Sequence, residues 1–237
     1  MMKCYYKTYV YIMICLICIL VFFGFSEATQ TSFEAYYITL HNRAIFIMMY
    51  LPLFLIGVIP VAMNLTIYEV VVRYNSKFEL VWNLQKPLFI YSVCYAGIGA
   101  IMVFLLAPFL EQKDSITEFN CYIFVLCGML IHTVSWFLIA NIFLVLYSFF
   151  RKIIWAYLIT MAIYLMASYI GMIEELQKKS YYLSGPRFMY VFFEIANIFE
   201  GISYMTYYCL LLAGSITITY QILKYRDLLF QARGKNI

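Results

Sequence analysis

The chain has 237 residues, of which 65% are hydrophobic and only 12% are charged. A soluble domain carries about 25% charged residues, so this composition excludes a water-soluble globular protein and indicates that lipid covers much of the surface. The net charge of +4 comes without any basic run longer than two residues, and the sequence therefore gives no indication of nucleic-acid binding.

Residues 1–28 have the three parts of a secretory signal. Lys3 and Lys7 form a basic start, residues 9–25 form an uncharged apolar core, and Ser26 and Ala28 are small residues at the positions that a signal peptidase recognises. This pattern favours cleavage after Ala28. The alternative is an uncleaved signal anchor, because the apolar core exceeds the usual length of about 7–15 residues. Both interpretations place the chain that follows outside the membrane.

Residues 29–237 contain five long apolar segments and are predicted to form one transmembrane helical domain. The spans lie near residues 44–68, 87–110, 120–150, 153–173 and 201–223. Each reaches the length of about 20 helical residues that crosses a bilayer core. The predicted fold is therefore all-α, a polytopic transmembrane helical bundle with about five spans after the leader, or six if the leader is not cleaved.

The positively charged residues predict an orientation for these spans. More of them fall on the side that the leader assigns to the cytoplasm, where they are Arg73, Lys77, Lys86, Arg151, Lys152, Lys224, Arg226, Arg233 and Lys235. The outer segments carry Arg43, Lys113, Lys178, Lys179 and Arg187. This bias follows the positive-inside rule. It predicts a multi-pass protein, expected in the plasma membrane, with its N-terminus outside and its C-terminus in the cytoplasm.

Several residues within the spans indicate contacts between helices. Asn64 in the first span is expected to bond to a neighbouring helix, because a polar amide in lipid needs a partner. In the second span, Ala96 and Ala100 have the small-xxx-small spacing of closely packed helices. The short Arg151-Lys152 segment predicts that the third and fourth spans are antiparallel neighbours. Such contacts support a bundle, and they are also compatible with a helix-mediated oligomer.

His132 is the most unusual polar residue in the third span. Small residues recur every seven positions beside it, at Cys121, Gly128 and Ser135, and such a stripe allows another helix to approach closely. One interpretation is a packed structural histidine. The other is a ligand or proton site in a cavity of the bundle.

The last apolar segment, residues 188–223, is longer than a membrane crossing requires, and its first part is expected at the outer surface. A polar and aromatic face covers about a third of the helix circumference there. Its residues are Glu194, Asn197, Glu200, Gly201, Tyr204 and Tyr208. This face is the best candidate for ligand binding, together with His132, because carboxylates and phenols in an apolar pocket can recognise polar small molecules. The alternative is a face neutralised by Lys178, Lys179 and Arg187.

The sequence contains no catalytic or metal-binding motif. HExxH, GxSxG and the glycine pattern of a P-loop are all absent. Cys15 and Cys18 lie in the apolar leader and are interpreted as small hydrophobic residues rather than metal ligands. We therefore expect no enzyme activity, no cofactor and no metal.

A family resemblance rests on residues 44–224. The outward N-terminus, Asn64 in the first span, Cys121 at the start of the third, Arg151-Lys152 after it and Trp155 in the fourth resemble the first five helices of a G-protein-coupled receptor. The Tyr-, Phe- and Ile-rich composition is similar to that of nematode serpentine chemoreceptors. This resemblance implies a seven-helix-receptor-like protein that senses a small molecule and signals through a G protein.

The chain also departs from that family. No acidic residue precedes Arg151, the outer loop around residues 174–187 has no cysteine for Cys121, and five spans are predicted where the family has seven. The resemblance therefore implies a truncated or strongly diverged member. The alternative function is a non-catalytic accessory or structural membrane protein that assembles through its helices. Membrane lipid is a partner under both hypotheses, and the receptor hypothesis adds a small-molecule ligand and a G protein.

Overall fold

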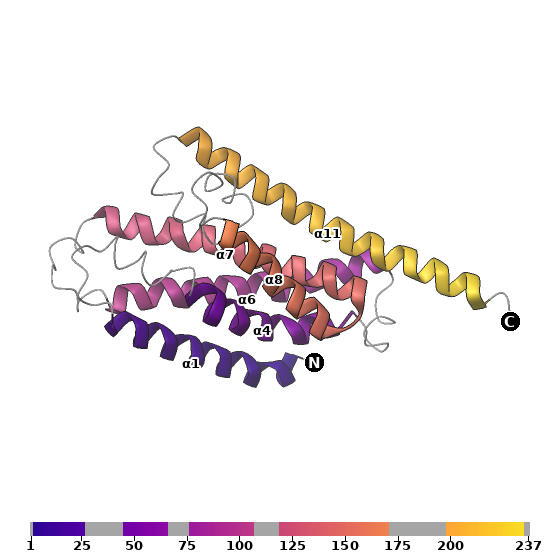
Figure 1. The fold of residues 1–237 in the computed structure, drawn as a ribbon, viewed down its shortest axis with the longest axis horizontal. Helices are drawn as coiled ribbons and strands as arrows, with labels where there is room; N and C mark the ends of the chain where they lie inside the picture. Colours follow the sequence, from indigo (N-terminus) through magenta and orange to yellow (C-terminus); the bar gives the residue numbers. More distant parts are fainter. Residues whose placement is uncertain (1, 27–44, 66–75, 107–118, 171–197, 235–237) are drawn as a thin grey trace.

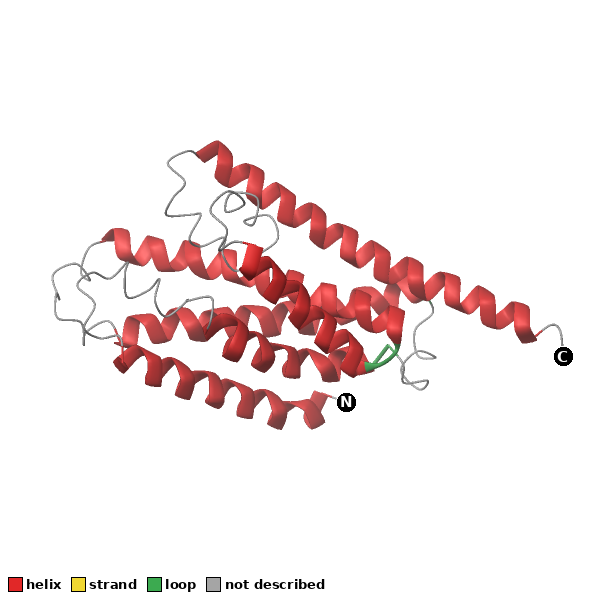
Figure 2. Cartoon of the chain, viewed as in Figure 1, coloured by secondary structure: helices red, strands yellow, loops and turns green. Residues whose placement is uncertain are grey.

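The computed structural model describes residues 2–26, 45–65, 76–106, 119–170 and 198–234. These segments are helical apart from short turns, and they contain no strand (Figure 2). In chain order the elements are α1 (Met2–Ser26), the π-helical turn η1 (Phe46–Tyr50), α4 (Leu51–Met63), α6 (Lys77–Leu106), α7 (Phe119–Phe150), α8 (Ile153–Ile170) and α11 (Ile198–Gly234). The predicted all-α helical bundle is confirmed.

Helix α7 is the centre of this bundle. It packs against α4, α6, α8 and α11, whereas α1 packs against α4 and α6. The helices α1 and α11 consequently lie on opposite sides (Figure 1). Burial follows the same arrangement, since 61% of the apolar stretch of α7 is buried but only 22% of that of α11. The side of α11 that is not buried is left for lipid or another partner.

Three helical stretches in the described part of the chain are long and apolar enough to cross a membrane. They are Phe46–Met63, Val125–Phe150 and Met205–Tyr225, and they overlap the spans predicted at 44–68, 120–150 and 201–223. Lys7–Phe23 and Ile153–Ala167 are shorter apolar helices. The chain is therefore a membrane protein. The spans predicted at 87–110 and 153–173 overlap α6 and α8, and as membrane crossings they stay predictions.

The first span is not a uniform α-helix. Pro52 has no backbone N–H, and its ring disfavours the regular turn before it. The wider π-helical turn η1 lies immediately upstream, with the N–H of Leu51 bonded to the carbonyl of Phe46. At the other end α4 stops at Met63, and Asn64 is the C-cap. Asn64 thus lies at the end of the helix, whereas the sequence predicted it inside the span.

Helix α6 begins well before the predicted span. The hydroxyl of Ser76 accepts the N–H of Glu79 at 3.1 Å, which satisfies a donor that the first turn leaves open. Glu79 in that turn also interacts favourably with the helix dipole. The charged residues that ended the hydropathy signal near residue 87 are therefore part of the helix, and Pro87 lies in its interior.

The turn between α7 and α8 consists of Arg151 and Lys152. Arg151 has a positive φ of 57°, a left-handed conformation that ends a helix, and its N–H bonds to the carbonyl of Tyr147 at 2.8 Å. The two helices pack against each other and run in opposite directions (Figure 1). The predicted antiparallel pair is confirmed.

Candidate functional site

A cavity of about 40 Å³ lies between α1, η1, α6 and α7. Its walls are apolar and aromatic apart from one imidazole, and they are formed by Leu16, Leu20, Phe46, Tyr50, Tyr95, Ala96, Gly99, His132 and Trp136. A water needs about 10–15 Å³ of such space, so the volume corresponds to about three waters or a small organic molecule. Four elements that are separate in the sequence meet at this cavity.

The helical repeat explains why these residues share the cavity. Tyr95 and Gly99 are one turn apart on α6, and His132 and Trp136 are one turn apart on α7, so each pair lies on one helix face. Leu16 and Leu20 have the same spacing on α1. All but Gly99 among these six are buried. The two helix faces therefore present one glycine, two large rings and one imidazole to the cavity.

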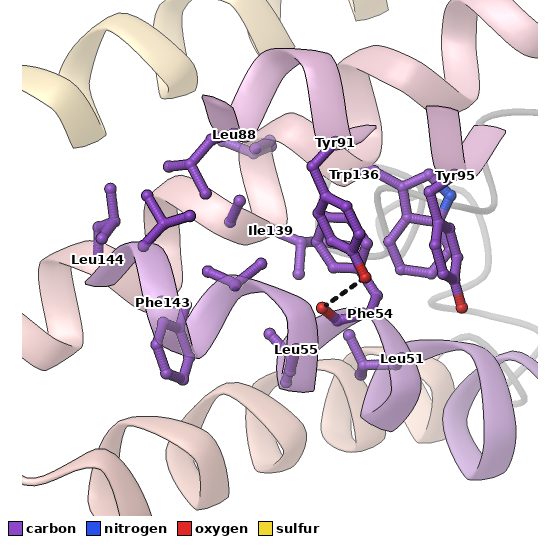
Figure 3. Packing of buried hydrophobic residues seen from close by; sticks show 14 of the residues in the cluster. Leu51, Phe54, Leu55, Leu88, Tyr91, Tyr95, Trp136, Ile139, Phe143 and Leu144 are labelled. Carbon is purple, nitrogen blue, oxygen red and sulfur yellow. Dashed lines mark hydrogen bonds between the residues drawn. The ribbon is translucent and has the colours of Figure 1, made fainter. Parts of the chain in front are cut away.

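An aromatic cluster supports the cavity from one side. The ring of Phe54 stacks on Tyr91 at a centroid distance of 5.0 Å, and it lies 4.6 Å from Trp136 (Figure 3). Trp136 is in turn 5.0 Å from Tyr95 and 5.1 Å from Phe46. Each such pair contributes about 0.5–1.5 kcal/mol beyond its buried area. The cluster therefore holds the rings of the cavity wall in defined positions.

Two tyrosine hydroxyls connect α6 to the first span. The Tyr95 hydroxyl donates to the carbonyl of Tyr50 at 2.9 Å. The Tyr91 hydroxyl donates to the carbonyl of Phe54 at 3.3 Å, as Figure 3 shows. Both rings are buried, so these bonds satisfy polar groups that water cannot reach. They fix α6 against η1 and α4 at the level of the cavity.

Two residues with small side chains on α6 leave the cavity space unfilled. Ala96 and Gly99 both line it, and a Cβ atom added at Gly99 would meet no heavy atom within 4 Å. Gly97, which does not line the cavity, also has open space at its Cβ position. The two glycines thus form a matched pair, one inside the cavity and one outside it.

The structure describes the side chains of only some of the predicted site residues. Glu194 and Asn197 lie outside the described residues, and Glu200 and Tyr204 are in α11 with side chains that are not described. Tyr208 is 2% exposed, and its ring lies 5.6 Å from that of Tyr207. Tyr208 does not line the cavity, but His132, which is 8% exposed, does. Of the two predicted site residues whose side chains are described, His132 is placed in a cavity wall and Tyr208 is not.

The sequence prediction missed the aromatic residues of the wall, Phe46, Tyr50, Tyr95 and Trp136. A weak signal was present, because Trp136 is one turn from His132. The small stripe beside His132 is consistent with its expected role in packing, as Gly128 and Ser135 are both buried. The side chain of Cys121, the third member of that stripe, is not described.

Within the described segments, no group of three or more His, Cys, Asp or Glu residues could hold a metal ion. A molecule in the cavity would contact apolar and aromatic side chains and one imidazole. No protein-family model, no curated protein and no solved structure matches the chain.

Proposed function

We propose that the chain is a non-catalytic receptor of the plasma membrane, which binds a small and mostly apolar molecule in the cavity between α1, η1, α6 and α7 and signals through a G protein. The observation that carries this proposal is the cavity itself. Sites for small molecules are mostly apolar and aromatic with a few polar groups, and His132 supplies such a group here.

The cavity also limits the size of the ligand. An engineered apolar cavity of about 150 Å³ binds benzene. A cavity of about 40 Å³ would therefore accept a smaller molecule or widen when a larger one binds. A volatile alcohol, amine or ketone of low molecular weight fits this description, with its polar atom near the imidazole of His132.

The position of the cavity would allow a bound ligand to change the arrangement of the helices. A ligand there would contact four elements at once, and it would favour whichever arrangement of α1, η1, α6 and α7 gives it the better contacts. Helix α7 extends from this level to the Arg151–Lys152 turn, which the charge distribution assigns to the cytoplasmic side. A G protein would be expected to act at that end.

The test is a cellular calcium response to a panel of small volatile compounds. The wild-type chain, verified at the cell surface, is expected to respond to some of them. The Gly99→Val variant fills the cavity and should lose the response, whereas Gly97→Val should keep it, because its side chain lies outside the cavity. No response from a surface-expressed wild-type chain would favour the alternative, an accessory membrane protein that assembles through its helices.

A further inference from the structure

A second, open groove lies between the end of α7 and residues 217–225 of α11. It has a volume of about 330 Å³ and is lined by Phe149, Thr217, Ile218, Gln221, Ile222 and Tyr225. Several of its apolar side chains are well exposed, with Phe149 at 57%, Ile218 at 50% and Tyr225 at 64%. The groove is thus an apolar surface on the side of the bundle where α11 passes α7 (Figure 1).

Basic residues lie beside the groove on both of its helices. On α11, Lys224 directly precedes the lining residue Tyr225. On the α7 side, Arg151 and Lys152 follow closely after Phe149 in the chain. All three cations are exposed. Each wall of the apolar slot therefore has exposed positive charge close in the chain to a lining residue.

We infer that this groove binds one anionic phospholipid, with an acyl chain along the apolar slot and the phosphate near Arg151, Lys152 and Lys224. The charge pattern decides between the candidate occupants. An apolar stretch of a second copy, such as Phe46–Met63 or Val125–Phe150, would cover the slot, but neither stretch contains an acidic residue that could meet the cations. An anionic lipid has both an acyl chain for the slot and a negative head group for the cations. Basic residues at the end of membrane helices attract such head groups. This inference does not depend on the ligand cavity.

The test uses the full chain purified from nanodiscs that contain phosphatidylcholine and phosphatidylserine with identical acyl chains. Native mass spectrometry then counts the lipids that remain bound. We expect one retained phosphatidylserine for the wild type. Lys224→Gln and Lys152→Gln should each weaken its binding about fivefold. Lys7→Gln, which removes an exposed charge from α1, should leave it unchanged.

A second pair of variants tests the apolar part of the groove. Ile218→Trp puts a large side chain into the slot and should displace the lipid, while Leu165→Trp changes an equally exposed residue of α8 and should not. Equal retention of both lipids, or equal losses in Lys224→Gln and Lys7→Gln, would overturn the inference. A cross-link between two Ile218→Cys chains would also overturn it, because the groove would then be an interface between copies.

Discussion

At the scale of single residues, Gly57 is a position where the Tyr91 side chain of α6 lies directly against α4. A Cβ atom added there would overlap the hydroxyl end of Tyr91, whose ring stacks on Phe54. The sequence gives no special sign of this role, since Gly57 is one of several glycines in apolar segments. Only the register between the two helices places the Tyr91 ring over this glycine.

Gly57→Ala is accordingly expected to destabilise the bundle by about 1–3 kcal/mol, the usual effect of extra volume in a packed core. Gly97→Ala is the matched control, because its added methyl group would enter open space on α6. Thermal unfolding in the same detergent measures both. Equal midpoints for the two variants would show that Tyr91 moves aside without loss and that the contact is not tight.

At the scale of elements, the α6–α7 interface contains two buried amides. Neither amide atom of Gln85 has a hydrogen-bond partner among the described residues, and the same holds for the carbonyl oxygen of Asn141. The amide nitrogen of Asn141 bonds to the carbonyl of Phe137 within its own helix. Phe137 lies against Phe89 across the interface, and Gln85 and Asn141 are each one turn from that contact on α6 and α7. The two amides therefore occupy the same level of the interface.

A buried polar atom without a partner destabilises a protein by about 1–3 kcal/mol. Gln85→Leu removes two such atoms at similar volume, so we expect it to raise the unfolding midpoint. Asn83→Leu is the comparison, because its amide donates to the carbonyl of Glu79 and its loss should not stabilise the chain. A lower midpoint for Gln85→Leu would mean that water or another group satisfies this amide.

The elements were largely predictable from the sequence, whereas the site was not. Apolar runs mark helices in lipid because every backbone polar group must be bonded within the segment. The run at 120–150 therefore predicted α7 almost to the residue. The same apolar residues give no indication of which face of the helix is buried against its neighbours. A helix that is apolar all round shows no periodicity to distinguish the side toward its neighbours from the side toward lipid. Trp136, which is buried, and Trp155, which is exposed, look alike in the sequence.

At the scale of the whole molecule, α1 is an integral part of the bundle. Ile12, Leu16 and Leu20 form one stripe at i, i+4 and i+8, and all three are buried against α4 and α6. Tyr9 adds a ring contact with Tyr91 at 5.1 Å. Cleavage after Ala28, which the sequence favoured, would remove one wall of the cavity. We therefore expect the mature protein to keep α1 as a sixth membrane helix.

An epitope tag at the N-terminus checks this expectation. It should remain on the full-length protein extracted from membranes. Leu16→Ala should destabilise the bundle by about 2–5 kcal/mol, as large-to-small changes in a core do, while Ile14→Ala on the exposed face of α1 should have little effect. Loss of the tag from correctly folded protein would establish that the leader is cleaved and that the cavity is open on that side.

The fluorescence of Trp136 reports directly on the binding of a small molecule in the cavity. The chain has three tryptophans, and Trp82 and Trp155 are exposed, so Trp82→Phe with Trp155→Phe leaves the cavity residue as the single reporter. Titration with the compound that gives the strongest cell response should change its emission saturably. The change should vanish with Gly99→Val and persist with Gly97→Val. Unchanged Trp136 emission at concentrations that activate cells would contradict the account, because the ligand would then bind elsewhere.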